Sequence, residues 1–148
     1  MTTIAVLGNF TGTDVDFSRA VTSFGGIALV TGSTVVPAAT AADAYVLLAP
    51  FVLGTKFKAD NASFHCADLD TGTNVQLDIG VVFADSTADI PTLFRSLSNV
   101  PQTGGFVTLT NTEWMNQAMP ANGWVVARIK TAPTTTAGAI TFNYGVSF

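Results

Sequence analysis

The sequence contains very few ionisable residues for its length. Six of its 148 residues are Lys or Arg, ten are Asp or Glu, one is His and one is Cys, so charged residues make up 11% of the chain. A single cysteine excludes an internal disulfide, and one His with one Cys supplies too few ligands for a conventional zinc site. With a net charge of −4 and scattered basic residues, no patch can neutralise many phosphates, so we expect no nucleic acid partner.

The residue types needed for catalysis are also scarce. His65 and Cys66 are adjacent, and neighbours on a strand point to opposite faces, so they cannot act as a pair. We expect Cys66 in the core and His65 facing solvent or an interface. Glycoside hydrolysis needs a pair of carboxylates, and the candidates are Asp68, Asp78, Asp85 and Glu113. Their spacing in the sequence does not single out any two of them as a pair. The sequence also lacks a phosphate-binding loop, a dinucleotide fingerprint, a nucleophile elbow and an HExxH motif. We therefore expect no enzymatic activity, with no catalytic residue, cofactor or metal site.

The acidic segment around residue 70 has a partial likeness to a calcium loop. Asp68, Asp70 and Asn74 have the spacing of its first ligands, but Gly72 stands where a ligand is needed and Ile79 where a Glu is needed. A β-turn is the better interpretation.

Long apolar runs without breakers are absent as well. The uncharged stretch 20–42 contains Gly, Pro, Ser and Thr, which a lipid-facing helix would not favour, so we expect no membrane span. No basic region followed by an apolar stretch marks a signal peptide. Together with the single cysteine, this predicts synthesis in a host cytoplasm.

The abundant residues are those that favour β-sheet. The chain has 22 Thr, 16 Val and 6 Ile, all β-branched types that fit a pleated sheet. Apolar residues alternate with polar or small ones in segments 74–83 and 139–148, and a similar alternation covers 124–130. Further strands are expected at 27–36, 44–53, 55–67 (with a bulge near Asp60 and Asn61) and 105–110.

Turn signals and one helical pattern connect these strands. Residues 70–73 (Asp-Thr-Gly-Thr) would close a hairpin between 55–67 and the strand ending at Phe83, and residues 133–138 would join the last two strands. Pro91 and the i,i+4 pairs Ile90/Phe94 and Leu93/Leu97 predict a short helix over 89–97. The predicted fold is an all-β antiparallel sandwich, jelly-roll-like, with one short helix; an immunoglobulin-like sandwich is the second choice. Residues 26–148 would form the sandwich, and residues 1–25 an N-terminal arm or a first strand pair.

Three aromatic residues are candidates for an interface. In a charge-poor β-protein, Trp114, Trp124 and Tyr144 serve either as core residues or as subunit-interface anchors, with a sugar-stacking platform as the alternative. A mean hydropathy of +0.43 together with so little charge indicates that much of the surface contacts other protein.

Residues 67–80 (ADLDTGTNVQLDIG) resemble a stretch in small virion structural proteins of tailed bacteriophages. The layout around them matches too: LAPFVL at 48–53 before it, Gly104-Gly105 after it, and the closing segment APTTTAGAITFNY at 132–144. The likeness covers about residues 45–148 and is carried by turn and strand features. The family resembled is that of the capsid decoration, or cement, proteins.

The resemblance implies a β-sandwich bound on the outer surface of the capsid, with the major capsid protein as partner. It implies a symmetric homo-oligomer, for which we favour a trimer, and no cofactor. The alternative is a phage tail, fibre or adhesin module that binds host-surface glycans.

Overall fold

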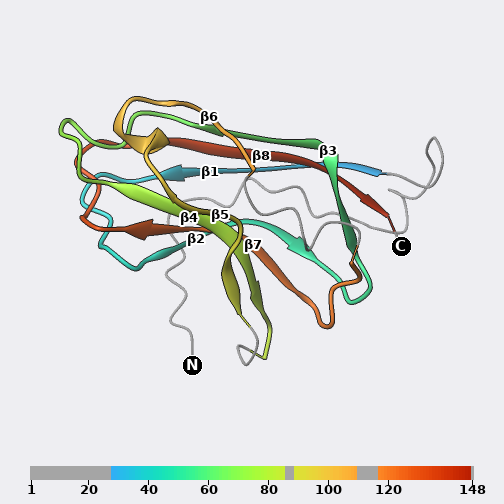
Figure 1. Ribbon diagram of the computed structural model, residues 1–148. Coiled ribbons are helices and arrows are strands. Elements are labelled where there is room, and N and C mark those ends of the chain that lie inside the picture. The colour runs from blue at the N-terminus through green and yellow to red at the C-terminus, as the bar shows by residue number, and fades with distance from the viewer. Residues whose placement is uncertain (1–27, 86–88, 110–116, 148) are drawn as a thin grey trace.

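The computed structural model describes residues 28–85, 89–109 and 117–147, which fold into two packed antiparallel sheets (Figure 1). The predicted all-β sandwich is therefore confirmed. The strands are β1 Ala28–Val36, β2 Tyr45–Phe51, β3 Lys56–Cys66, β4 Gln76–Phe83, β5 Ile90–Ser98, β6 Gly105–Val107, β7 Gly123–Lys130 and β8 Gly138–Ser147. A single-turn 3-10 helix, η2 Val100–Gln102, lies between β5 and β6. The expected N-terminal unit, residues 1–25, lies outside the described residues.

The chain crosses between the two sheets repeatedly. One sheet has the order β1-β8-β3-β6 and the other β2-β7-β4-β5, so the chain changes sheet at almost every connection and β4–β5 is the consecutive pair that shares one. The spacing of the turns predicted a sandwich of this kind, with several short strands in two sheets. Each sheet is therefore built from antiparallel pairs of strands that are mostly distant in sequence, such as β1–β8 in one sheet and β4–β7 in the other.

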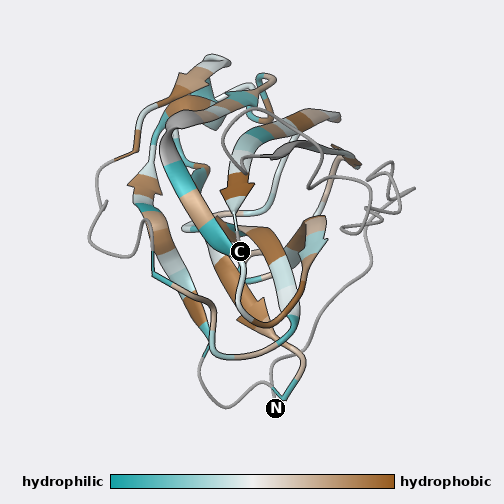
Figure 2. Ribbon diagram, turned by 90° about the vertical axis from the view of Figure 1, so that its right-hand side faces the viewer, coloured by the Kyte–Doolittle hydropathy of each residue, from teal (hydrophilic) through white to brown (hydrophobic). Residues whose placement is uncertain are grey.

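The period-two patterns place the core where the sequence predicted it. Leu77, Ile79 and Val81 of β4 are fully buried between the sheets, and Phe142 and Tyr144 of β8 oppose them from the other sheet. Figure 2 shows the corresponding alternation of hydrophobic and hydrophilic residues along several strands. Aromatic rings fill the centre: Phe142 stacks on Phe64 at 4.0 Å and on Tyr144 at 4.4 Å between ring centroids.

One side of the sandwich is closed by close backbone approach. A Cβ atom on Gly32 of β1 would lie 2.2 Å from the carbonyl oxygen of Leu48 in β2, so only glycine fits there. The hydroxyl of Thr34 donates to the carbonyl of Leu47 at 2.6 Å. The edges β1 and β2 are thus tied together, whereas the opposite edges are β5 and β6.

The predicted helix over 89–97 is wrong, because this segment is strand β5. A step of two residues along β4, from Ile79 to Val81, is matched by a step of five residues along β5, from Arg95 to Ile90. Such bulges break the period-two pattern and leave apolar residues three and four apart, which imitates a helix. Pro91 is tolerated because β5 is an edge strand, where a missing N–H breaks no ladder.

The hairpin predicted at 70–73 is also wrong. Strands β3 and β4 belong to different sheets, so the turn leads from one sheet to the other. The turn geometry is local, but the partner of each strand is set by long-range pairing with β8 and β7. The bulge expected near Asp60 and Asn61 is confirmed by a register shift between Lys58 and Ser63.

Candidate functional site

The three predicted interface aromatics have different locations. Tyr144 is 1% exposed and its ring packs between Phe57 and Phe142, so it belongs to the core and offers no surface for an interface. Burial raises the pKa of its hydroxyl, whose oxygen has no hydrogen-bond partner among the described residues. Trp124 is half-buried on β7, and Trp114 lies outside the described residues.

His65 and Cys66 point to opposite faces of β3, as predicted. Cys66 is 4% exposed, and burial, with a smaller contribution from the charge of Asp68, raises the pKa of its thiol to about 12. A thiol in this state is a poor nucleophile. His65 is exposed, and its ring lies 4.1 Å from the ring of Phe106.

The buried acids serve the fold. The carboxylate of Asp70 accepts hydrogen bonds from the backbone N–H groups of Gly72, Asn74 and Val75 and from the hydroxyl of Thr135. The backbone donors, with Val75 the strongest, lower the pKa of Asp70 to about 2. Both carboxylate oxygens are thus engaged in organising the turn. This arrangement supports the interpretation of the segment as a turn.

Asp78 is paired in a similar way. Its carboxylate is 2% exposed and accepts hydrogen bonds from Nε and Nη2 of Arg128 at 3.0 and 2.6 Å, and from the N–H of Leu97 at 2.9 Å. Burial opposes the charge of Arg128, but the hydrogen bond and the charge of Asp78 outweigh it and raise the pKa of Arg128.

Among the described residues, no group of three or more His, Cys, Asp or Glu could hold a metal ion. Within the same ranges, no helix is long and apolar enough to cross a membrane.

The feature best suited to binding is the side of the sandwich between β5 and β6, which we call the β5–β6 edge. It carries two of the exposed large hydrophobic residues, Leu97 at 48% and Phe106 at 69%. Both strands are the last in their sheets, so in the described part of the chain neither has a partner on its outer side. Unpaired strand edges with exposed apolar side chains are a common template for strand addition.

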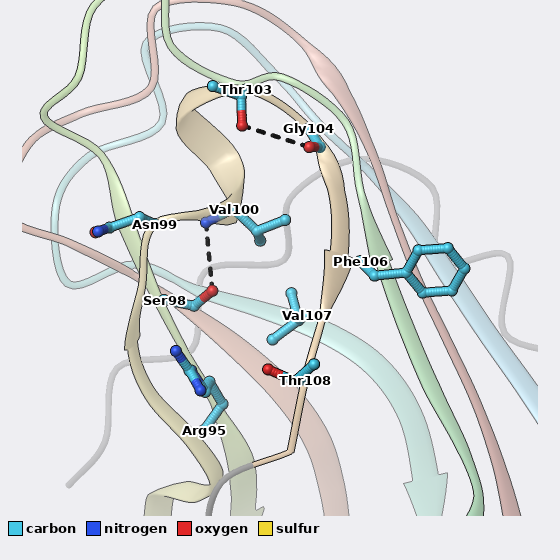
Figure 3. A pocket seen from close by; sticks show the side chains of 9 residues that line it. All are labelled: Arg95, Ser98, Asn99, Val100, Thr103, Gly104, Phe106, Val107 and Thr108. Carbon is cyan, nitrogen blue, oxygen red and sulfur yellow. Dashed lines mark hydrogen bonds between the residues drawn. The ribbon is translucent and has the colours of Figure 1, made fainter.

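A polar pocket of about 360 Å³ opens at this edge, lined by Arg95 and Ser98 of β5, the η2 turn, and Val107 and Thr108 at β6 (Figure 3). Arg95, Val107 and Thr108 converge on the pocket, whereas the ring of Phe106 points away from it. A second hollow of about 500 Å³ is lined by Ala62, Ser63 and residues 106–109.

Arg95 is the unusual charge of this pocket. Its side chain is half-buried and its Nε atom is inaccessible to water, yet it has no hydrogen bond to any described residue. Two ion pairs of the described residues join other cations, Arg128 and Lys130, to Asp78 and Asp43. An unsatisfied guanidinium N–H is unfavourable. Because the half-buried guanidinium of Arg95 lines the pocket, a carboxylate that entered the pocket could pair with its accessible part.

The edge is the best candidate for a protein-binding site. It combines a free backbone edge, an exposed aromatic ring and a cation that has no partner among the described residues. The pocket beside Arg95 is lined by hydroxyl groups of Ser98, Thr103 and Thr108. Arg95 and Phe106 were not among the residues singled out from the sequence. The sequence feature that could have drawn attention to Arg95 is the scarcity of basic residues. For Phe106 it is the position directly after Gly104-Gly105.

Comparisons with known proteins support the fold. No family model matches the chain, and no curated protein matches it. A chain in the structure "Capsid of Ralstonia phage GP4" superposes with a TM-score of 0.69 at 19% identity, over 85% of this chain and 86% of that one. A chain in "Cyanophage Pam1 capsid asymmetric unit" superposes with a TM-score of 0.63 at 15% identity, over 99% and 93% respectively. The sandwich of this protein is thus a fold present in two bacteriophage capsid structures.

Proposed function

We propose that this protein is a bacteriophage virion structural protein that decorates the head by binding the outer surface of the major capsid protein. The observation that carries the proposal is the likeness of almost the whole chain to chains in two phage capsid structures. The chain's resemblance to decoration proteins at residues 67–80 points the same way. Its location would be the capsid surface, with copies joined as a symmetric oligomer, for which we favour a trimer.

The physical properties of the chain suit such a role. A decoration protein stabilises a shell through contact area repeated at many sites, with no chemical step. Each apolar contact contributes roughly 25 cal/mol per Å² of buried surface before the costs of ordering are subtracted. A chain with 11% charged residues and with exposed apolar side chains away from the β5–β6 edge, such as Val35 and Leu53, offers surface of this kind.

The direct test is binding to heads. The phage that encodes the chain is grown with this gene deleted, and its purified heads are mixed with increasing amounts of the full-length protein. We expect the protein to co-sediment with heads to a saturating level and to raise the temperature at which heads release DNA. The variant Asp43→Asn, altered at an exposed ion pair remote from the β5–β6 edge in the fold, should bind as the native chain does.

Failure to co-sediment, or an image of the virion with the protein in the tail, would reject the decoration role. The tail outcome would revive the glycan-binding alternative, for which the described residues hold no supporting arrangement: Trp124 is half-buried, and Trp114 is not described.

A further inference from the structure

We infer that the β5–β6 edge binds residues 13–17 of a second copy of this chain, with the carboxylates of Asp14 and Asp16 directed at Arg95. This inference deepens the proposed function, since it names a contact between copies in the oligomer. Three features of the edge carry it: its free strand, its two chemically different faces and the guanidinium of Arg95, which has no partner in ranges 28–85, 89–109 and 117–147.

The first step is the free strand. Strand β6 pairs with β3 through Phe64, His65 and Cys66, and within the described ranges its other side pairs with nothing. An extended segment can add there and satisfy the exposed backbone groups, as in other strand-addition complexes. Any segment in extended conformation meets this requirement, so specificity must come from side chains.

The second step is the difference between the two faces at β6. Phe106 and its neighbour His65 lie on the outer face, where Phe106 is 69% exposed. Val107 faces inward, on the side where Arg95 reaches into the pocket (Figure 3). An added strand therefore needs apolar side chains facing outward, beside Phe106, and acidic side chains facing inward, toward Arg95.

The third step identifies the occupant. Residues 13–17 lie outside the described residues, but their sequence, Thr-Asp-Val-Asp-Phe, has the required alternation. In a strand, Asp14 and Asp16 share one face while Val15 and Phe17 share the other. Ten residues separate Phe17 from the start of β1 at Ala28, enough to span about 35 Å when extended.

Charge also argues against the simplest alternative pairing. If β6 paired with β6 of a second copy around a two-fold axis, the two Arg95 side chains would approach each other in one shared groove. Like charges so placed are unfavourable. A head-to-tail contact, in which the acidic segment of one copy meets Arg95 of the next, is attractive and closes into a ring such as a trimer.

The experiment measures the mass of the full-length chain in solution by light scattering across a dilution series. We expect the native chain to associate. Two variants, Arg95→Glu and the double variant Asp14→Lys with Asp16→Lys, should each weaken association by about 10- to 100-fold, which is the effect of losing hydrogen bonds between charged groups. A chain that carries all three substitutions should associate again. Arg95→Lys should retain part of the association, and Asp43→Asn is the matched control at an exposed ion pair elsewhere.

A peptide of residues 11–18 should dissociate the native oligomer, whereas the same peptide with both Asp changed to Asn should not. Thermal unfolding of each variant shows whether a loss of association reflects a loss of fold; in that case the peptide competition decides. Three results would overturn the inference. The native chain could be a monomer, its oligomer could be insensitive to these substitutions, or Arg95 could be occupied by residues 13–17 of the same chain. Head binding is measured separately, so a monomer that still binds heads overturns this contact and leaves the decoration role intact.

Discussion

The buried ion pair between Asp78 and Arg128 gives the sharpest test of the structure. We predict that Asp78→Ala destabilises the fold much more than Asp43→Ala, although both acids form ion pairs of nearly equal length. The N–O distance is 2.6 Å for Arg128–Asp78 and 2.7 Å for Lys130–Asp43. The difference is burial, because the side chain of Asp78 is 2% exposed and that of Asp43 is 69% exposed.

The size of the effect follows from the groups left behind. Removing the Asp78 carboxylate leaves a partly buried guanidinium and the N–H of Leu97 without their acceptor. Breaking a buried pair in this way costs about 3–5 kcal/mol, and since the Arg128 side chain is 22% exposed and retains some water, we expect about 3 kcal/mol. For a domain of this size that lowers Tm by roughly 6–12 °C. Removal of the exposed Asp43 should leave Tm nearly unchanged.

The assay is urea unfolding and calorimetry of both variants, with Arg128→Ala and the double variant completing a thermodynamic cycle. We expect the double variant to be less destabilised than the sum of the single variants, because no unpaired charge remains buried. Equal losses of stability for Asp78→Ala and Asp43→Ala would refute the reasoning. So would strict additivity in the cycle.

Three further predictions concern the turn, the bulge and the core. The pKa of Asp70 is about 2 in the folded chain against an ordinary 3.8. Between these two pH values the folded state binds fewer protons than the unfolded state, so the stability of the fold should fall as pH drops from about 4 to 2. Asp70→Asn should flatten that part of the pH profile of unfolding. Gly80→Ala should lower Tm sharply, because the added Cβ would lie 2.2 Å from the carbonyl oxygen of Ile90. The control Gly72→Ala should change Tm little, because its Cβ would make ordinary contacts. Similar Tm values for the two variants would contradict the packing. The Cys66 thiol, with its raised pKa, should resist maleimide at pH 8 in the folded chain and react once urea unfolds it, and rapid labelling of folded protein would place Cys66 at the surface.

The sequence was misinterpreted where the alternation of apolar and polar residues along a strand is interrupted. Strands β4, β7 and β8 were correctly placed because alternate residues of each enter the core, and the side chains of a strand alternate with a period of two. In β4 the other face is buried as well. Strand β5 was mistaken for a helix because its bulges against β4 shift the apolar residues to three- and four-residue spacing. Nothing within 89–97 itself reveals the partner strand that makes the bulges possible.

The candidate site follows the same rule. Counts of His, Cys and acidic residues led us to expect no catalytic cluster, since a reaction centre needs several of them together. The β5–β6 edge could not be inferred, because it depends on which strands end up last in their sheets. Arg95 becomes a candidate only when the structure shows it beside β6 without a partner among the described residues.

Composition and alternation by themselves therefore determined the class of fold, the facing of the regular strands and the burial of Cys66. These are local properties, set by which side chains avoid water and by a backbone that turns them to alternate faces. The tertiary structure alone decided that β3 and β4 lie in different sheets, that Tyr144 is a core residue, and that Arg95 and Phe106 lie on two strands that border the same open edge. Those outcomes depend on pairing between residues distant in sequence, whose free energy is shared across the whole sandwich.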